Sequence, residues 1–372
     1  MKAAAVFPGK KSVSVIDFDE PTLSSPSDVK LRILQVGVCG TDREICSFVY
    51  GTPPSGFEYL VLGHECIGEV VETGPAVTSL KPGDLVIPMV RRPCDHPECF
   101  ACRAGRQDFC YTGDYTERGI KERHGFMTEL VVDDEKYMNQ VPVELREVAV
   151  LVEPLTIAEK GMLQIATIQQ RLPWGCPAAD GQPAQYCHKA VVLGAGPVGL
   201  LGAMALVNAG FETWVYSRET EPAQSIDIVK AIGAKYISSK VSNVDRMAAA
   251  VGNIDVVYEA TGASQLAFDV LRVLGTNGLF VLTGVPGRHG PVEVDTDLIM
   301  RNIVLKNQNV LGTVNAGKDA FQNAIRDLTA FYRRWPDAVK SLITGRYPID
   351  RFEEPIQHPE GIKNIIEVAN PS

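Results

Sequence analysis

The stretch that decides the fold is AVVLGAGPVGLLGAMALVNAG, residues 190–210, which holds twenty-one residues without a charge. A run of this length is long enough to cross a bilayer as a helix. Pro197 and the clustered glycines favour instead a short buried strand, a glycine turn and a buried helix. We therefore expect no transmembrane helix and no membrane partner.

The turn inside this stretch is a G-x-G-x-x-G motif, formed by Gly194, Ala195, Gly196, Pro197, Val198 and Gly199. The first glycine permits a tight turn, the second lets the backbone approach a pyrophosphate, and the third lets the helix pack on the strand. The phosphates would lie at the helix N-terminus, where free N–H groups and the helix dipole favour an anion. The motif in this context predicts a dinucleotide site.

The end of the next expected strand, residues 212–217, indicates which nucleotide is bound. An NAD enzyme typically has Asp or Glu about 20 residues after the glycines. Here Ser217 occupies that place and Arg218 follows it. Because an arginine can pair with a 2′-phosphate in a bidentate manner, the sequence favours NADP. Glu219 or Glu221 could still serve NAD.

Strand-like and helix-like segments alternate beyond residue 190. Further strands are expected at 254–260, 279–284 and 303–307, and a helix at about 317–334. This alternation predicts a doubly wound parallel sheet, the Rossmann α/β architecture, over residues 189–312. Residues 313–372 are expected to return to the first domain.

The first part of the chain has a β-rich pattern. Strands are expected at 29–38, 66–74 and 84–90, and the polar stretch 171–189 is typical of a loop between domains. A chain of 372 residues is long enough for two domains. We assign residues 1–188 to a catalytic domain.

The composition and the N-terminal sequence indicate which kinds of partner and which cellular compartment to expect. A net charge of −9 argues against nucleic acid as a partner. The apolar stretch before Pro8 has only five residues, too short for a secretory signal, so a cytoplasmic location is expected. The nine cysteines are then not expected to form disulfides.

Four of these cysteines fall between residues 91 and 110, in RRPCDHPECFACRAGRQDFC. Four thiolates can close a tetrahedral zinc shell that leaves no position for a substrate. The spacing therefore predicts a structural zinc lobe at about 91–112, held by Cys94, Cys99, Cys102 and Cys110. A redox Cys-x-x-Cys pair and unliganded thiols remain the alternatives.

A second set of metal donors is spread along the chain. Cys39, His64 and Glu153 offer a thiolate, an imidazole and a carboxylate, the ligand types of a catalytic zinc that keeps one position open. A lone cysteine or histidine is more often structural. Beside a dinucleotide loop, the combination indicates a zinc-assisted oxidoreductase.

A family resemblance is carried by CGTD (39–42), GHE (63–65), GEVVETG (68–74), VEPL (152–155) and GAGPVG (194–199). These motifs resemble those of the zinc-dependent medium-chain alcohol and polyol dehydrogenases, and they occur in that family's order. A closer resemblance, to the microbial glucose dehydrogenases, is carried by residues 103–120, 217–219 and 311–316. It implies a β-rich GroES-like catalytic domain, a Rossmann domain and two zinc ions per chain.

The resemblance assigns roles to individual residues. Cys39 and His64 would bind the catalytic zinc, with Glu65 entering or leaving its shell and Glu153 binding directly or through water. Thr41 resembles the hydroxyl that passes the substrate proton outward, and the substrate contacts implied are Thr41, Glu117, Glu153 and Asn315. The cofactor contacts implied beyond the glycine loop are Ser217, Arg218, Glu219, Thr283, Gly284, Val285, Thr313, Val314 and Asn315.

One departure concerns the lobe. The family usually places its first ligand three residues before Cys99, where this chain has His96. We favour Cys94, since a loop with Pro97 can absorb two extra residues, and His96 stays the alternative first ligand.

The resemblance implies an NAD(P)-dependent enzyme that oxidises the anomeric hydroxyl of an aldose, D-glucose first, to the aldonolactone. One alternative is a zinc polyol, secondary-alcohol or threonine dehydrogenase. A remote alternative is a non-catalytic NADP-binding sensor, which would have lost zinc ligands that are present here. Family members are commonly dimers or tetramers, so a homo-oligomer is expected.

Overall fold

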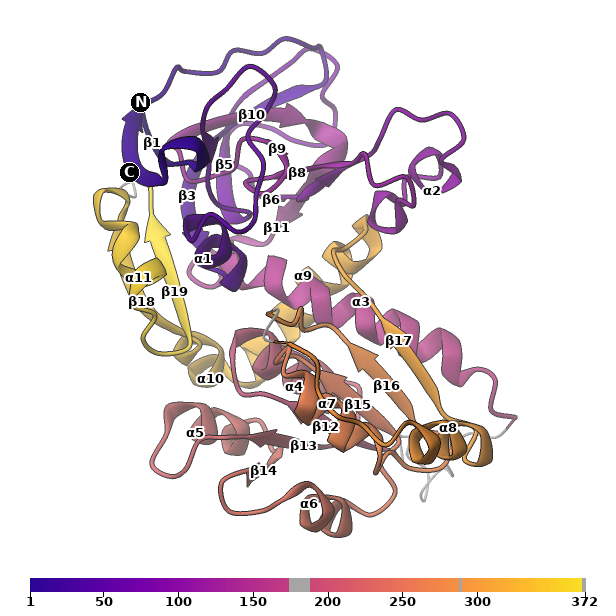
Figure 1. The fold of residues 1–372 in the computed structure, drawn as a ribbon. Coiled ribbons are helices and arrows are strands. Elements are labelled where there is room, and N and C mark those ends of the chain that lie inside the picture. The colour runs from indigo at the N-terminus through magenta and orange to yellow at the C-terminus, as the bar shows by residue number, and fades with distance from the viewer. Residues whose placement is uncertain (174–187, 288–289, 370–372) are drawn as a thin grey trace. The chain divides into compact units, whose positions relative to one another are not determined.

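The computed structural model describes residues 1–173, 188–287 and 290–369 (Figure 1). The chain divides into two compact units, the first formed by 1–156, 315–332 and 342–372 and the second by 157–314 and 333–341. The chain first passes from one unit to the other within helix α3 (Val152–Gln169). We expected this boundary further along the chain, at residue 188. Most of the loop expected at 171–189 lies outside the described residues.

The second unit contains the expected doubly wound sheet, which confirms the Rossmann prediction. Its six strands are all parallel and run in the order β14-β13-β12-β15-β16-β17. The chain therefore reverses its winding between β12 and β15, where sheets of this kind bind ligands. The strands are β12 (Lys189–Leu193), β13 (Glu212–Ser217), β14 (Lys235–Ser238), β15 (Val256–Glu259), β16 (Leu279–Leu282) and β17 (Asn309–Gly312).

Helices connect these strands. They are α4 (Pro197–Asn208), α5 (Gln224–Ala231), α6 (Val244–Val251), α7 (Ser264–Leu271) and α8 (Thr296–Leu305). The stretch that opened the sequence analysis forms β12, the glycine turn and α4, whose residues from Gly199 to Leu206 are all buried. No described helix has both the length and the apolar character that a membrane span needs.

The strand expected at 303–307 is wrong. Residues up to Leu305 belong to α8, and the edge strand β17 begins four residues later. The β-branched run favoured a strand by propensity, but Asp295 caps the helix by accepting a hydrogen bond from the Leu298 N–H at 3.0 Å. Asn307, with a φ of +49°, then turns the chain toward β17.

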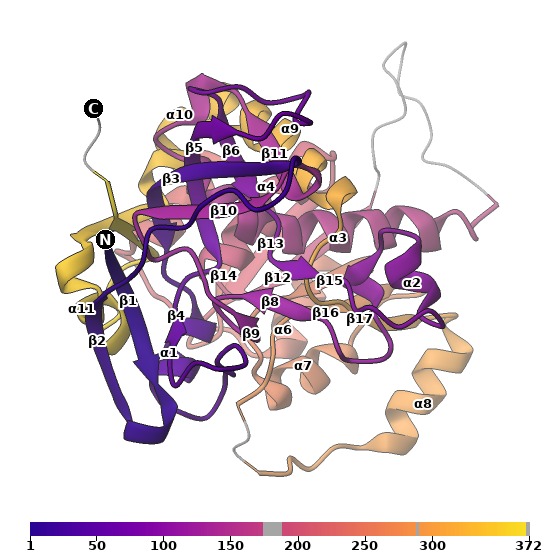
Figure 2. The same ribbon diagram turned by 90° about the horizontal axis from the view of Figure 1, so that it is seen from above.

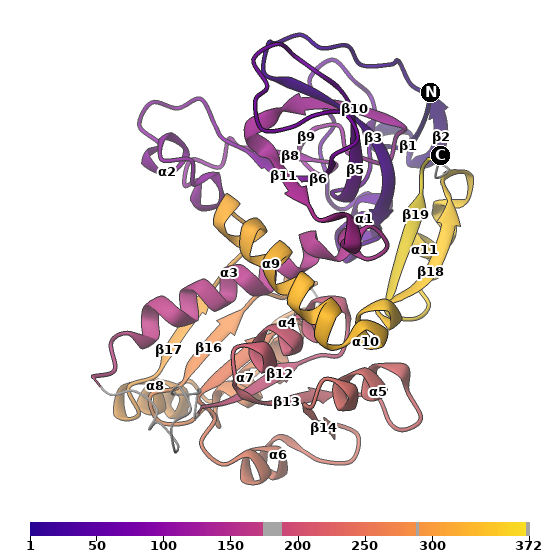
Figure 3. The same cartoon turned by 180° about the vertical axis from the view of Figure 1, so that it is seen from behind.

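The first unit is β-rich, as predicted. A seven-stranded sheet has the order β11-β6-β5-β3-β19-β18, with β10 also paired to β3. Smaller sheets have the orders β2-β1-β4 and β7-β8-β9. Figure 2 shows the long pair β1 and β2, and Figure 3 shows β18 and β19 side by side.

The strands of the first unit are β1 (Lys2–Phe7), β2 (Ser12–Asp17), β3 (Asp28–Gly37), β4 (Leu60–Val61), β5 (Glu65–Thr73), β6 (Leu85–Pro88), β7 (Arg91–Arg92), β8 (Thr116–Arg118), β9 (Glu122–Arg123), β10 (Leu130–Asp134), β11 (Met138–Val141), β18 (Ile343–Pro348) and β19 (Lys363–Glu367). The other helices are α1 (Gly40–Cys46), α2 (Phe100–Arg103), α9 (Lys318–Arg334), α10 (Pro336–Ser341) and α11 (Glu353–Gln357). Strand β3 is buried along most of its length because it has neighbours on both edges.

The short strand β4 is held by a histidine. His124 Nδ1 accepts a hydrogen bond from the Val61 N–H at 3.1 Å, so this nitrogen carries no proton. The imidazole is packed among three aromatic rings, Phe18, Phe57 and Tyr59. Burial, and then the charge of Arg118, lower the pKa of His124 to about 4.

We predict a pH-dependent loss of stability that His124 causes. Its pKa in the folded chain is about 4, below the ordinary value of 6.5, so the unfolded chain takes up the proton first as the pH falls. The stabilisation is complete above about pH 6.5 and is lost toward pH 4. We expect this loss to be about 1 to 2 kcal/mol, allowing for solvent screening of the partly exposed ring.

The measurement is urea unfolding between pH 4 and pH 7 for the wild type and for His124→Asn. Asparagine at this position keeps an acceptor for the Val61 N–H but does not titrate. The variant should therefore show a flatter pH dependence across this window. An unchanged slope would contradict the role of His124.

Candidate active site and metal centres

The first group of metal donors gathers at the start of α1. Cys39 immediately precedes this helix, and its backbone N–H donates to Asp42 Oδ2 at 2.9 Å. The Cys39 thiol lies 3.9 Å from the Thr41 hydroxyl. The first turn of α1 therefore fixes the position of Cys39 and places an exchangeable hydroxyl beside it.

His64 and Glu65 reach the same place from the turn between β4 and β5. Gly63 makes this turn with a φ of +89°, and a Cβ there would come within 2.8 Å of Val36. The ligand atoms of Cys39, His64 and Glu65 lie within 4.8 Å of one another. A thiolate, an imidazole and a carboxylate at this separation form a donor set that suits zinc.

Asp42 lies beside His64 within this group. The Asp42 carboxylate is fully buried, and its Oδ1 lies 3.6 Å from His64 Nδ1. Both atoms are buried without a hydrogen-bond partner among the described residues. Although burial opposes protonation, the charge of Asp42 and then a hydrogen bond with Cys39 raise the pKa of His64. A cation bound at the imidazole would take the place of that proton.

Glu153 approaches the group from the first turn of α3. Burial, and then the neighbouring Glu65 carboxylate, raise the pKa of Glu153 to about 8. Glu153 is not among the three residues whose ligand atoms lie within 4.8 Å of one another, so it borders that group. Lys363, which is buried, pairs with Glu65 and donates to the Val38 carbonyl at 2.9 Å.

The charge balance of this group also suits a metal. Three carboxylates and one thiol lie near one lysine and one histidine. Close carboxylates in a buried site repel one another unless a cation lies between them. The residues therefore fit a divalent cation, and Lys363 supplies part of the compensation.

The four cysteines of the lobe converge. Their sulfur atoms lie within 4.8 Å of one another, with Cys110 Sγ 3.9 Å from Cys99 Sγ and 3.8 Å from Cys94 Sγ. Although burial opposes it, the Thr112 hydroxyl and then the Gly113 N–H lower the pKa of Cys110 to about 6. A thiolate is the form of cysteine that binds metal, so this environment fits a closed zinc shell.

His96, the alternative first ligand of the lobe, points elsewhere. Its side chain is 40% exposed, with Nε2 2.5 Å from Asp114 Oδ2 and Nδ1 3.3 Å from Glu98 Oε1. It would have to leave both carboxylates to replace Cys94. The geometry therefore favours the set of four cysteines.

Two of the four residues expected to contact the substrate, Glu117 and Asn315, contact each other. Asn315 Nδ2 donates to Glu117 Oε1 at 2.9 Å, although 198 residues separate them in sequence. Arg91, which the sequence analysis did not single out, donates from Nε to the same oxygen at 3.0 Å. The structure thus brings the expected pair together and adds a cation.

The glycine loop has the geometry that its motif predicts. Gly194 has a φ of +103°, and a Cβ on Gly199 would lie 2.2 Å from the Gly194 carbonyl oxygen. A Cβ on Gly196 would meet no described atom within 4 Å. The N-terminus of α4, where Pro197 is the first residue, therefore has room for a phosphate.

The end of β13 combines the residues expected to choose the nucleotide. The Ser217 hydroxyl donates to Glu219 Oε2 at 2.5 Å, and the Tyr236 hydroxyl donates to the Glu219 carbonyl at 2.9 Å. The Arg218 side chain is 85% exposed, with its Nε 3.7 Å from Glu219 Oε1. The Glu219 carboxylate is thus held back by Ser217, while the Arg218 guanidinium stays accessible.

Glu259, at the end of β15, organises the adjacent loops. Its Oε1 accepts from the backbone N–H groups of Thr261 at 2.6 Å and Gly262 at 2.9 Å. Its Oε2 accepts from the Gly284 N–H at 3.2 Å, and the Thr283 hydroxyl donates to its carbonyl at 2.6 Å. One buried carboxylate therefore shapes two loops, and only its place at a strand end could have signalled this in the sequence.

The remaining residues expected at the cofactor follow β16 and β17. The Thr313 N–H donates to the Leu282 carbonyl at 3.0 Å, and the Val314 carbonyl accepts from Lys160 Nζ at 2.9 Å. Val285 and Val314 are both exposed. These residues lie beyond the carboxyl ends of parallel strands, where such sheets bind nucleotides.

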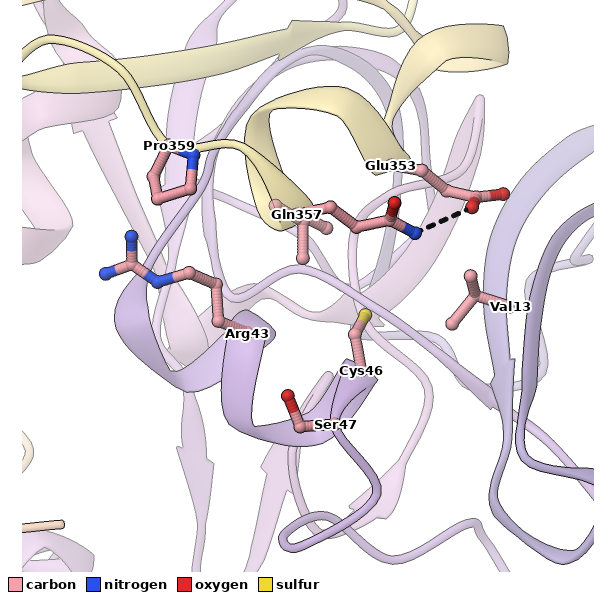
Figure 4. Close-up of a pocket in the computed structure, with 8 residues that line it drawn as sticks. Val13, Arg43, Cys46, Ser47, Glu353, Gln357 and Pro359 are labelled. Carbon is pink, nitrogen blue, oxygen red and sulfur yellow. Dashed lines mark hydrogen bonds between the residues drawn. The ribbon is translucent and has the colours of Figure 1, made fainter.

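A separate cavity of about 410 Å³ lies at the end of α1, next to α11 (Figure 4). Burial raises the pKa of its Cys46 to about 12, so this thiol stays protonated. None of the residues expected at the active site lines it. The lining residues are Val13, Arg43, Cys46, Ser47, Glu353, Ile356, Gln357 and Pro359.

Two family profiles match the chain. Residues 146–368 match the glucose dehydrogenase C-terminus, and residues 25–143 match the alcohol dehydrogenase GroES-like domain. Glucose 1-dehydrogenase of Methanocella arvoryzae is 38% identical over 371 residues, covering 99% of this chain and 100% of that protein. Glucose 1-dehydrogenase 2 of Vulcanisaeta moutnovskia is 37% identical and covers 99% of both chains.

Solved structures of two dehydrogenases are also similar to this chain. Haloferax mediterranei glucose dehydrogenase, in complex with NADP, Zn and gluconolactone, has a TM-score of 0.87 at 33% identity and covers 100% of both chains. Galactitol-1-phosphate dehydrogenase of Escherichia coli has a TM-score of 0.79 at 20% identity, which shows the shared fold alone.

For the lobe we predict that Cys102→Ser lowers the zinc content by one ion per chain and lowers the Tm by roughly 5 °C or more. Three thiolates cannot close the shell, so the loop loses the metal that pins it. Metal analysis by mass spectrometry and thermal unfolding measure the two effects.

The matched pair for this experiment is Cys94→Ser and His96→Ala. If Cys94 is the first ligand, its variant loses zinc and the His96 variant keeps it. Loss of zinc from His96→Ala alone would instead support the set of one histidine and three cysteines.

For the nucleotide site we predict that Glu259→Gln raises the Kd for NADP about tenfold, since it leaves a backbone N–H facing an amide N–H. Calorimetric titration measures the affinity. Glu212→Gln is the control, because Glu212 lies in the same unit and makes a surface ion pair with Lys235 at 2.6 Å. Equal affinities in the two variants would contradict the role of Glu259.

Proposed function

We propose that this chain, which belongs to the zinc-dependent medium-chain dehydrogenases and to their glucose dehydrogenase branch, oxidises the anomeric hydroxyl of D-glucose with NADP. The product is the aldonolactone. The observation that carries the proposal is the match over the whole chain to a glucose dehydrogenase whose structure holds NADP, Zn and gluconolactone. The convergence of Cys39, His64 and Glu65 supports it independently of the names.

The zinc ligands follow from the donor set. Cys39 and His64 would hold the catalytic ion, with Glu65 or Glu153 providing the carboxylate. Zinc bound there supplies Lewis acidity that lowers the pKa of an alcohol. Cys94, Cys99, Cys102 and Cys110 would hold a second, structural ion, because four thiolates leave no position for a substrate.

The chain's own residues handle the proton and the sugar. Thr41 lies beside Cys39, and its hydroxyl would accept the substrate proton and pass it outward. Glu117 and Asn315 would bind sugar hydroxyls, which a simple alcohol cannot supply. The glycine loop would hold the pyrophosphate of the nucleotide.

The preference for NADP rests on the end of β13. Ser217 is small and holds the Glu219 carboxylate back, while the Arg218 guanidinium is exposed. An exposed guanidinium can bind a 2′-phosphate, and a carboxylate would repel it. The NADP in the Haloferax mediterranei structure agrees with this arrangement.

We also propose that the chain forms a homo-oligomer, a dimer or tetramer. The exposed apolar side chains of α8, Met300, Val304 and Leu305, support this. The described cysteines are all free, which agrees with a reducing compartment such as the cytoplasm.

Initial rates with D-glucose test the proposed function. We expect turnover with NADP ahead of NAD, loss of activity after chelation, and its recovery when zinc is added. In Arg218→Ala the KM for NADP should rise about tenfold while the KM for NAD changes little. Sorbitol, threonine and ethanol are the substrate controls.

Two outcomes would contradict the proposal. Faster turnover of sorbitol, threonine or ethanol would replace the sugar as substrate and keep the zinc chemistry. No turnover of any of them, in protein that binds zinc and NADP, would remove the dehydrogenase assignment.

A further inference from the structure

Arg91 and Glu117 face each other across a pair of strands. The register of β7 and β8 places Arg91 opposite Glu117, and both side chains are buried. Their ion pair has an Nε–Oε1 distance of 3.0 Å. Burying an ion pair costs free energy unless further hydrogen bonds hold both groups. The contacts around Arg91 and Glu117 therefore indicate what the pair does.

The two oxygens of Glu117 are used unequally. Oε1 accepts from Arg91 Nε at 3.0 Å and from Asn315 Nδ2 at 2.9 Å. Oε2 has no hydrogen-bond partner among the described residues, and the protein does not enclose this atom completely. One oxygen is thus anchored twice, and the other keeps its lone pairs for an incoming donor.

Arg91 is itself held in place. Its guanidinium carbon lies 3.6 Å from the centroid of the Tyr115 ring, a close cation–π contact. Its backbone carbonyl accepts from Gln107 Nε2 at 3.4 Å, in the lobe that carries the four cysteines. The guanidinium is therefore fixed, so it can fix the carboxylate in turn.

We propose that Arg91 is a positioning residue for sugar recognition, holding Glu117 so that Oε2 accepts a hydrogen bond from one substrate hydroxyl. This inference rests on the proposed function. Because a carboxylate oxygen accepts hydrogen bonds, Oε2 selects a hydroxyl donor at that position of the sugar. A sugar that lacks this hydroxyl leaves the carboxylate oxygen without a partner and is rejected.

The experiment compares kcat/KM for D-glucose with that for 2-, 3-, 4- and 6-deoxyglucose. The wild type should reject at least one deoxy sugar by roughly ten- to a hundredfold. In Arg91→Met and Glu117→Gln that ratio should fall toward one, through a higher KM for glucose. Arg91→Lys, which keeps the charge but not the planar fork, should keep part of the ratio.

Arg92 provides the matched control. It is the next residue of β7, is equally buried, donates to Asp133 Oδ2 at 2.5 Å, and stacks on Tyr137 at 4.0 Å. Arg92→Met therefore removes a comparable buried ion pair that makes no contact with the Glu117 carboxylate. It should lower the Tm and leave the ratio between glucose and the deoxy sugars as in the wild type.

The outcomes separate this inference from the proposed function. Wild-type turnover of glucose, with Arg91 variants that slow all sugars equally, overturns the role of Arg91 and leaves the function intact. If Arg91→Met does not fold, Arg91→Lys and Glu117→Gln decide the question. If the wild type oxidises no aldose, the proposed function fails and this inference falls with it.

Discussion

The proposed catalytic group, Cys39, His64 and Glu65, depends on one buried cation. Lys363 pairs with Glu65 and donates to the Val38 carbonyl, within a group that also contains Asp42 and Glu153. Without it the carboxylates would repel one another strongly in a low-dielectric site. Its position follows from the sheet, since β19 pairs with β3, the strand that leads into Cys39 and α1. Strand register therefore sets the charge balance of the metal site.

The same arrangement recurs at two other places in the chain. Glu117 is anchored by a guanidinium and an amide, and Glu259 by backbone N–H groups of two loops. In each case a buried carboxylate receives at least one donor from another segment of the chain. These hydrogen bonds keep the surrounding loops in one conformation.

Features that depend on residues close in sequence could be predicted, whereas features that depend on pairing between strands or loops could not. The glycine loop and the cysteine spacing are local patterns, so the sequence predicted the Rossmann domain and the cysteine lobe. Lys363, Arg91 and Glu259 act through partners on other strands or loops, and a single sequence does not show that register. The strand expected at 303–307 failed because its β-branched residues resemble a strand locally, whereas the Asp295 cap decides for a helix.

The position of Lys363 near the C-terminus has a consequence for the nascent chain. Val38 and Lys363 lie 325 residues apart, and the second unit, residues 157–314 and 333–341, is synthesised between them. The ribosome therefore synthesises Cys39, His64, Glu65 and Glu153 long before Lys363, whose positive charge balances the group. The group therefore reaches its final charge balance only when β19 is added to the sheet beside β3.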